Sequence, residues 1–258
     1  MAFDRLKAKI KGIKYLPFEQ DGKTYNLYDM PKGFVIKGNL NLSRKGLTEL
    51  PDLSEVVVKG GFYCYENELT SLEGAPQRVG GDFYCYKNQL TSLEGAPKEV
   101  SGDFGCRNNQ LTSLEGAPQR VGRNFSCSNN KLTSLEGAPE EVGGDFICYN
   151  NHLTSLVGLP LIKVSMKIYC DDSLGNKYGF SDTLIDGVSY KQLCASPVYK
   201  SETAMNRVRS KLPPKQVETK ENLATPNLTN QQQEEAFEKI NAEFSQWLKD
   251  NSAKPTRE

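Results

Sequence analysis

The chain has 258 residues, and its 32 Lys and Arg side chains balance its 32 Asp and Glu side chains. Because a zero net charge creates no general attraction for phosphates or acidic lipids, a dominant nucleic-acid or membrane-surface binder is disfavoured. No run approaches the ~18 apolar residues of a membrane-spanning helix. The charged first 16 residues also lack the apolar centre of a signal peptide. We therefore expect a soluble, cytoplasmic protein.

Residues 1–37 are predicted to cap the N-terminal end of the fold. Asp21-Gly22 lies between β-favouring residues, which is typical of a tight hairpin turn. A short amphipathic helix before it is indicated by apolar side chains at near-helical spacing: Phe3, Leu6, Ile10 and Ile13. Because this segment holds 8 basic and 4 acidic residues, a helix that contacts a membrane is the alternative to a cap.

A repeat of 21 residues dominates the middle of the chain. The string LTSLEGAP recurs unchanged at 69–76, 90–97, 111–118 and 132–139. Six of the seven cysteines follow the same period, with one spacing of 22: Cys64, Cys85, Cys106, Cys127, Cys148 and Cys170. With a divergent copy at each end, about seven rungs span residues 38–175. A fixed period in this range predicts a solenoid, whose end copies diverge because they meet water.

Each rung is predicted to bury the side chains that recur. A Phe stands two residues before each Cys from Cys64 to Cys148, so in a strand both point to the interior and stack on their counterparts at ~4.8 Å. In the end copies, Leu40 and Ile168 take the place of the Phe. An Asn three residues after each Cys from Cys64 to Cys148 is expected to bind the turn backbone with its buried amide, so that no polar group stays unpaired.

The pattern F-x-C-x-x-N-x-L-T-S-L resembles the leucine-rich repeat, L-x-L-x-x-N-x-L, with Phe and Cys replacing two leucines. A short repeat that ends in L-T-S-L and then Pro is similar to the bacterial class found in secreted effectors and phage-encoded proteins. The resemblance implies a β-rich, right-handed solenoid with a parallel sheet on its concave side and few helices. The Gly and Pro of each E-G-A-P stretch also disfavour a long helix on the return path.

The cysteine column has three interpretations. Thiolates strung along a line do not converge on one metal ion, so a metal site is disfavoured. Disulfides between adjacent rungs fit the expected spacing, but a cytoplasmic chain is kept reduced. Buried thiols that pack like small hydrophobes need no further assumption and are favoured. We therefore expect neither a metal nor another cofactor.

The sequence holds no recognisable catalytic constellation. Cys170-Asp171-Asp172 resembles the Cys-x-Asp motif of the large ubiquitin-ligase domains that follow the repeats in some bacterial effectors. Here, however, Cys170 lies on the repeat itself. Cys194 is expected within a C-terminal cap over 176–196, and His152, the single histidine, occupies a variable polar position. We predict that the protein is not an enzyme; a thiol enzyme using Cys170 or Cys194 is the alternative.

Side chains that change between rungs mark the expected binding surface. The outward positions hold two aromatic groups: Tyr63, Tyr65, Tyr84 and Tyr86 in early rungs, and Ile147, Tyr149 and Tyr169 in late rungs. A small, polar stretch with Arg107 at its edge separates them. Tyr and Arg dominate many protein interfaces, so these residues are predicted to bind a protein. The alternative is that stacked tyrosines only stabilise the sheet.

Nucleic-acid bases also stack on tyrosine rings. However, residues 51–160 hold 8 basic and 14 acidic residues, a net charge of −6, which opposes a phosphate backbone. Neither a nucleic acid nor a membrane is therefore expected as a partner.

The C-terminal part is predicted to be a linker followed by a helix. Residues 197–229 are rich in Pro, Lys, Glu, Thr and Asn, which favours an extended arm. Residues 230–250 follow a helical pattern, with Thr229 as the N-cap. The apolar stripe of this helix comprises Phe237, Ile240, Phe244, Trp247 and Leu248. The stripe is expected to be buried in a dimer, in a partner groove or on the solenoid.

These features predict a rigid scaffold that recognises another protein through its concave strands, assisted by the terminal helix. The resemblance implies an effector or phage protein that inhibits or redirects a host or defence protein by steric occlusion. A structural protein that self-associates through 230–250 is the alternative.

Overall fold

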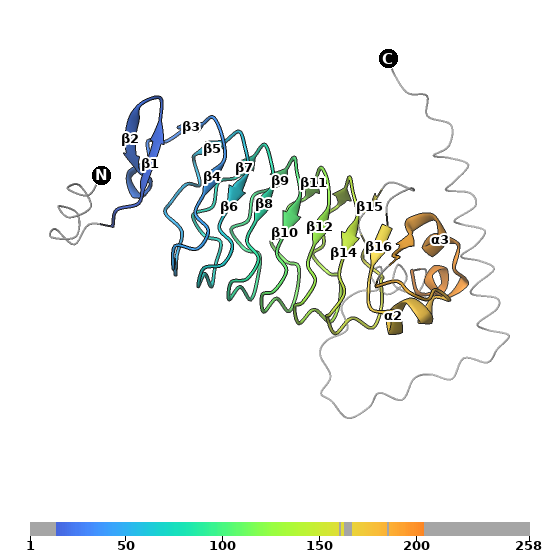
Figure 1. The fold of residues 1–258 in the computed structure, drawn as a ribbon. Helices are drawn as coiled ribbons and strands as arrows, with labels where there is room; N and C mark the ends of the chain where they lie inside the picture. The colour runs from blue at the N-terminus through green and yellow to red at the C-terminus, as the bar shows by residue number, and fades with distance from the viewer. Residues whose placement is uncertain (1–13, 160, 163–166, 185, 204–258) are drawn as a thin grey trace, which may run out of the picture. The chain divides into compact units, whose positions relative to one another are not determined.

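The computed structural model describes residues 14–159, 161–162, 167–184 and 186–203. Within them the chain forms a β-solenoid of about six turns, with short strands stacked in parallel and few helices (Figure 1). The predicted β-rich coil is therefore confirmed. Each regular rung contributes two strands rather than the single strand expected, so two sheets run along the coil.

The first sheet, here called the Phe-strand sheet, contains the Phe-Cys segments. It has the order β17-β16-β14-β12-β10-β8-β6-β4 and is parallel except for β17. Its strands are β4 (Leu40–Asn41), β6 (Phe62–Tyr63), β8 (Phe83–Tyr84), β10 (Phe104–Gly105), β12 (Phe125–Ser126), β14 (Phe146–Ile147), β16 (Lys167–Tyr169) and β17 (Val188–Ser189). Leu40 pairs with Phe62, and Ile168 pairs with Phe146, which confirms the divergent copies at both ends.

The second sheet, here called the Val-strand sheet, is not predicted from the sequence. It is parallel throughout, with the order β15-β13-β11-β9-β7-β5-β3. Its strands are β3 (Val35–Ile36), β5 (Val57–Val58), β7 (Arg78–Val79), β9 (Glu99–Val100), β11 (Arg120–Val121), β13 (Glu141–Val142) and β15 (Leu161–Ile162). The sequence signal for this sheet is a buried Val that recurs with the repeat: Val58, Val79, Val100, Val121 and Val142.

Outward residues of the Val-strand sheet alternate in charge. Arg78, Glu99, Arg120 and Glu141 are direct neighbours on in-register strands. Opposite charges on adjacent strands stabilise their pairing. This face of the solenoid therefore compensates its own charge.

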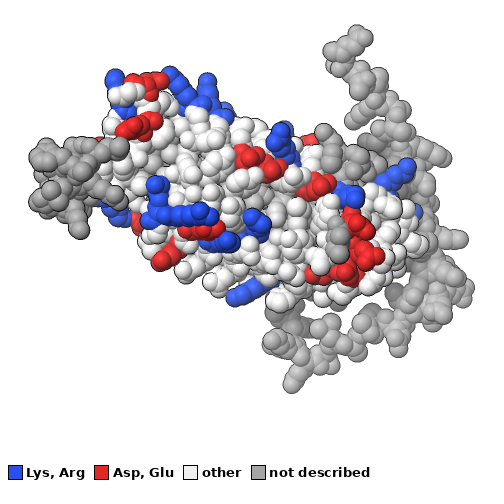
Figure 2. Space-filling view, in the orientation of Figure 1, with Lys and Arg blue, Asp and Glu red and all other residues white. Residues whose placement is uncertain are grey.

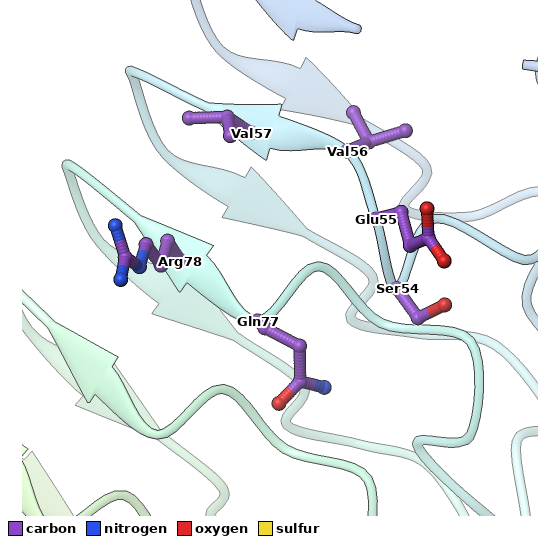
Figure 3. A pocket seen from close by; sticks show the side chains of 6 residues that line it. All are labelled: Ser54, Glu55, Val56, Val57, Gln77 and Arg78. Carbon is purple, nitrogen blue, oxygen red and sulfur yellow. The ribbon is translucent and has the colours of Figure 1, made fainter. Parts of the chain in front are cut away.

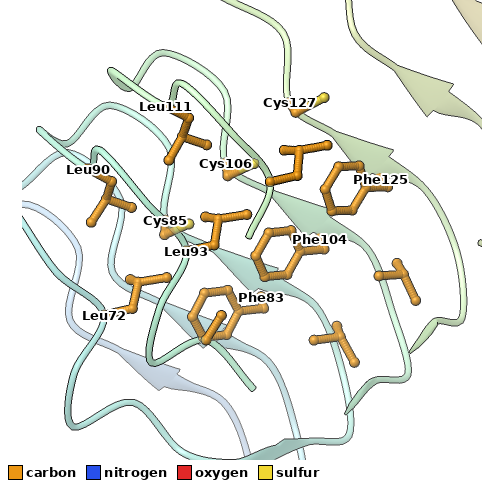
Figure 4. Packing of buried hydrophobic residues seen from close by; sticks show 14 of the residues in the cluster. Leu72, Phe83, Cys85, Leu90, Leu93, Phe104, Cys106, Leu111, Phe125 and Cys127 are labelled. Carbon is orange, nitrogen blue, oxygen red and sulfur yellow. The ribbon is translucent and has the colours of Figure 1, made fainter. Parts of the chain in front are cut away.

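The Phe column forms the centre of the hydrophobic core (Figure 4). Its five rings are at most 1% exposed, and the centroids of neighbouring rings lie 5.2 to 5.4 Å apart. The six cysteines of the repeat are fully buried, and the leucines of L-T-S-L fill the remaining interior. The predicted interior of each rung is therefore confirmed. Since one rung has no core of its own, folding depends on contacts between rungs.

A ladder of buried Asn side chains joins each turn to the preceding one. Asn109 Nδ2 donates to the carbonyl oxygens of Cys106 at 3.0 Å and Cys85 at 3.1 Å. Its Oδ1 accepts from the backbone N–H groups of Leu90 at 3.1 Å and Asn88 at 3.2 Å. Bonds to the two flanking Cys carbonyls recur at Asn88, Asn130 and Asn151. The prediction that a buried amide binds the turn backbone is confirmed.

The Gly of each E-G-A-P stretch lies where no side chain fits. Gly95 has a φ of +88°, and a Cβ built on it lies 2.6 Å from the backbone nitrogen of Glu73 in the preceding rung. Close approach of two backbones at a positive φ requires glycine. Gly46 also has a positive φ, +63°, but nothing lies within 4 Å of its Cβ position.

A β-hairpin lies at the N-terminal end of the described chain. β1 (Pro17–Gln20) pairs antiparallel with β2 (Lys23–Asn26). Asp21 and Gly22 form the turn with φ of 53° and 72°, as a type I′ hairpin requires. The predicted hairpin is confirmed, and the short helix η1 (Leu27–Asp29) follows it. The helix predicted over the first 13 residues lies outside the described part of the chain.

The Gln20 side chain covers the free edge of β3. Its Nε2 donates to the carbonyl oxygen of Val35 at 3.0 Å, and its Oε1 accepts from the N–H of Lys37 at 2.8 Å. An amide side chain thus takes the place of a neighbouring strand. Such cover prevents the edge from pairing with another chain.

A small α/β cap closes the other end of the solenoid. β17 pairs antiparallel with β16, and the short helices α2 (Asp172–Lys177) and α3 (Tyr190–Ala195) belong to the same cap (Figure 1). Ser189 begins α3 through a capping box with Gln192. The paired acceptors and donors of this motif satisfy the first turn of the helix.

The start of the predicted linker differs from the expectation. Residues 197–203 are helical, and the Tyr199 ring lies edge-on to Tyr178 at 5.8 Å. Pro is favoured at the first position of a helix, so Pro197 begins a helix here instead of an extended arm. The rest of the predicted arm and the helix over 230–250 lie outside the described residues.

Gly95→Ala is expected to destabilise the fold more than Gly46→Ala. Both changes place a Cβ at a positive φ, which costs about 1–2 kcal/mol, but only at Gly95 does it also collide with backbone atoms. Urea unfolding followed by circular dichroism measures the difference. Equal losses in the two variants would contradict the close contact between rungs.

Asn109→Asp is expected to make stability depend on pH. A carboxylate keeps an acceptor but loses both amide donors, so its charge faces the carbonyl oxygens of Cys85 and Cys106. The pKa of the new carboxyl is then raised in the folded state, and the free energy of unfolding falls as pH rises through it. Melting temperatures across this range, with exposed Asn108→Asp as the control, measure the effect. Parallel pH profiles for the two variants would contradict it.

Candidate functional site

The outward side of the Phe-strand sheet carries the predicted aromatic residues. In-register pairing of β6 and β8 stacks Tyr63 on Tyr84 with ring centroids 5.5 Å apart, and Tyr65 stacks on Tyr86 at 4.5 Å. The rings of Tyr84 and Tyr86 also meet at 5.9 Å. These four residues, here called the tyrosine cluster, are half-buried on the surface of the sheet.

Two arginines close the stack of Tyr65 and Tyr86. The Arg107 guanidinium carbon lies 4.6 Å from the centroid of the Tyr86 ring, and that of Arg44 lies 5.9 Å from the Tyr65 ring. Such contacts contribute about 0.5–1 kcal/mol each at exposed sites. We call Arg44, Tyr65, Tyr86 and Arg107 the cation-aromatic column. When the repeats are aligned, Arg44 corresponds to Glu66, one residue after Tyr65. The contact between Arg44 and the Tyr65 ring is therefore not predicted from the sequence.

Glu66 holds two of the basic side chains beside the column. Its carboxylate accepts from Arg44 Nε at 2.6 Å and from Lys87 Nζ at 2.9 Å. These two bonds lower the pKa of Glu66 to about 2, so its charge persists at neutral pH. Arg107 is exposed and makes no ion pair with another described residue. Figure 2 shows Lys and Arg side chains gathered around an acidic one over the early rungs.

An acidic ladder borders the tyrosine cluster. The Oδ1 of Asp82 accepts from the N–H of Asp103 at 2.9 Å, and the Oδ1 of Asp103 accepts from Asn124 at the same distance. The Tyr84 hydroxyl lies 3.3 Å from the Oδ2 atoms of both aspartates and donates to either. Burial and the two carboxylates raise the pKa of Tyr84. The sequence signal for this ladder is the recurrence of Asp or Asn before Phe, which the sequence-based prediction did not use.

Small side chains separate the tyrosine cluster from the second aromatic group. Gly105 is the in-register neighbour of Tyr84, and a Cβ built on it lies 3.0 Å from the Tyr84 ring. The Oγ atoms of Ser126 and Ser128 follow, 3.5 Å apart. The predicted polar stretch is therefore present, and Gly105 makes room for the Tyr84 ring.

The second aromatic group is less tightly organised. Ile147 pairs in register with Tyr169, and Tyr149 lies two residues after Ile147. All three are half-buried, but no ring stacking joins the two tyrosines to another described ring. The structure thus places all the predicted residues of the repeat on one sheet, and it stacks only the early group with Arg107.

Open depressions on the described surface lie beside the Val-strand sheet and at the glycine turns. One, of about 210 Å³, is lined by Ser54, Glu55, Val56, Val57, Gln77 and Arg78 beside the Val-strand sheet (Figure 3). Another, of about 430 Å³, lies at the glycine turns between the sheets and reaches Tyr63 and Asp82. Small-molecule sites bury most of their ligand in a concave pocket. Because these depressions are open, the candidate site is the outward face of the Phe-strand sheet and not a small-molecule pocket.

The cysteines lie in environments that keep them protonated. Desolvation raises the pKa values of Cys85, Cys106 and Cys127 well above the ordinary thiol value. Burial also raises the pKa values of Cys170 and of Cys194, which is half-buried. The thiolate is the reactive form, so the repeat cysteines act as packing groups. The predicted burial of this column is confirmed.

His152 is exposed, as predicted for its variable position. In the part of the chain that the structure describes, no three His, Cys, Asp or Glu side chains are grouped to hold a metal ion. That part also has no helix with the length and apolarity to cross a bilayer. The predicted apolar stripe of Phe237, Ile240, Phe244 and Trp247 lies outside it.

No family model matches the chain, and no curated protein or solved structure matches it.

Reaction with a colourless aromatic disulfide reagent is expected to modify Cys194 first. The six cysteines of the repeat are fully buried, so they are expected to react only after unfolding in guanidinium. Absorbance of the released thiolate gives the rates, and mass spectrometry of peptides identifies the sites. Rapid labelling of Cys85 or Cys106 in the folded chain would contradict the buried column.

Proposed function

We propose that this protein is a binding module that docks a partner protein on the tyrosine cluster and the cation-aromatic column. The observation that carries the proposal is the stacking of four half-buried tyrosines beside two arginines on one sheet. Tyr and Arg are enriched among the residues that dominate the binding free energy of protein interfaces. Because stacking already orders these side chains, less rotamer entropy is lost on binding.

Two features of the site favour a protein over a nucleic acid. Bases bind to free aromatic faces, but each ring of the column stacks on the other ring and carries an arginine on its second face. Residues 51–160 also carry a net charge of −6, which opposes a phosphate backbone. The edges and hydroxyl groups of Tyr65 and Tyr86 remain accessible to a partner, and a protein surface can contact both.

A purely structural role for the tyrosines accounts for only part of the arrangement. Cross-strand stacking explains the contacts between Tyr63 and Tyr84 and between Tyr65 and Tyr86. It does not require a charged, exposed side chain at the end of the column. Arg107 has this character, and it supports a role in recognition.

We further propose that the repeats are leucine-rich repeats of the short class known from bacterial effectors and phage-encoded proteins. The F-x-C-x-x-N-x-L-T-S-L pattern supports this family, together with its parallel strands and Asn ladder. Such a protein acts in the cytoplasm without catalysis of its own. It inhibits or redirects a host or defence protein by covering its surface.

Replacement of Tyr84 and Tyr86 with alanine is expected to abolish capture of the partner. Loss of two anchoring side chains costs at least about 2 kcal/mol, or roughly 30-fold in Kd. The immobilised full-length chain is incubated with a host lysate, and quantitative mass spectrometry compares the captured proteins. The matched control replaces Glu99 and Arg120 with alanine, an opposite-charge pair on the Val-strand sheet.

Circular dichroism and thermal melting verify that both double variants keep the fold. A partner that the tyrosine variant captures as well as the unchanged chain would contradict the assignment of this face. Loss of a partner only in the Glu99 and Arg120 control would instead assign the binding site to the Val-strand sheet.

A further inference from the structure

We infer that the partner presents an acidic protein segment to the cation-aromatic column, with a carboxylate bound to Arg107. The inference rests on the proposed function, since it names the chemistry of the segment that docks on this face. It is carried by the hydrogen-bonding capacity that the column leaves unused and by the distribution of charge around it.

The groups that the column presents to a partner favour an electronegative ligand. The ring faces of Tyr65 and Tyr86 are covered, so the rings expose their edges, which carry the positive part of the aromatic quadrupole. The hydroxyl groups of Tyr65 and Tyr86 form no hydrogen bond with another described residue. The guanidinium of Arg107 adds a fork of N–H donors. Carboxylate oxygens match this set of groups.

The other charges near the column already have partners. Glu66 binds both Arg44 and Lys87. On the opposite side of the cluster, the oxygens of Asp82 and Asp103 accept from backbone N–H groups and from the Tyr84 hydroxyl. Arg107 is therefore the basic side chain without an ion pair among these described residues, while Asp82 and Asp103 are hydrogen-bonded to neutral groups and keep their negative charges.

The position of Arg107 also favours a planar anion. Its guanidinium lies over the Tyr86 ring, which limits its orientations before a ligand arrives. A pre-oriented guanidinium binds a carboxylate through two parallel hydrogen bonds, whereas an ammonium group acts as a point charge. Charge and geometry thus both contribute to recognition.

The charge distribution gives the docked segment a direction. Asp103 and Arg107 are four residues apart in one rung, about 13 Å along an extended chain, and the Tyr84 ring leans over Gly105 between them. A carboxylate is attracted to the Arg107 side of the cluster and repelled from the Asp103 side, so the docked segment carries its negative charge at the Arg107 end. The net charge of −6 over residues 51–160 opposes a backbone with a phosphate on every nucleotide, whereas a segment with this one carboxylate places its charge beside Arg107. Complementary and repulsive charges together select one orientation of the partner.

Selection of a random library of short displayed peptides on the immobilised full-length chain tests the inference. The enriched peptides are expected to share an Asp or Glu at one end. Synthetic fluorescent copies then give Kd values by anisotropy. Arg107→Glu is expected to raise Kd about tenfold or more, and Arg107→Lys to raise it less because the charge is kept.

Lys98→Glu is the matched control, because Lys98 is also exposed and precedes a strand of the other sheet. It reverses the same charge and is expected to leave Kd unchanged. Melting temperatures of all three variants verify the fold.

The outcomes separate this inference from the proposed function. Peptides that lack this Asp or Glu, or that ignore Arg107→Glu but are lost with the Tyr84 and Tyr86 double variant, overturn the inference and leave the function standing. Peptides that ignore every change on the face, or a selection that enriches none, overturn both. Fluorescent oligothymidylate that binds more tightly than the acidic peptides, and is released by Arg107→Glu, overturns both in favour of a nucleic-acid phosphate.

Discussion

The buried Asn amide links the geometry of every rung to that of its neighbour. Asn109 binds two carbonyl groups and two N–H groups, and these belong to its own rung and to the one before it. A slip of one residue between rungs would leave the three buried backbone groups of the preceding rung unpaired, at a cost of about 1–3 kcal/mol each. Register is therefore exact along the stack, and Phe lies on Phe because the turn beside it allows no other alignment.

Exact register has a second consequence on the outside of the coil. Equivalent outward residues form columns at strand spacing, so two tyrosines that recur in adjacent repeats necessarily meet face to face. The two sheets use this property differently. Arg78, Glu99 and Arg120 alternate in charge and compensate one another on the Val-strand sheet. The Phe-strand sheet instead collects aromatic rings and ends them with Arg107, whose charge has no partner in the described chain.

Prediction from the sequence succeeded where a residue recurs because burial requires it. The Phe, Cys and Asn columns are of this kind. The hairpin at Asp21 was predicted on a separate ground, because its turn needs residues that adopt a positive φ. Prediction failed for contacts between residues of different columns. Arg44 reaches the ring of Tyr65 from a neighbouring position, and the Tyr84 hydroxyl reaches the aspartates of two rungs. The length and direction of the side chains decide such contacts, and the period of a repeat gives no information about either.

The sequence by itself determined the period, the number of rungs to within the divergent ends, the buried Phe, Cys, Asn and Leu columns and the outward position of the tyrosines. These follow from alternation along a strand and from the need of each repeat to cover the next. Only the tertiary structure decided that a second sheet forms at Val79 and its equivalents, and that Arg107 rather than Arg44 is left without an ion pair among the described residues. The physical reason is that these outcomes depend on distances between side chains of different rungs, which exist only once the coil has closed.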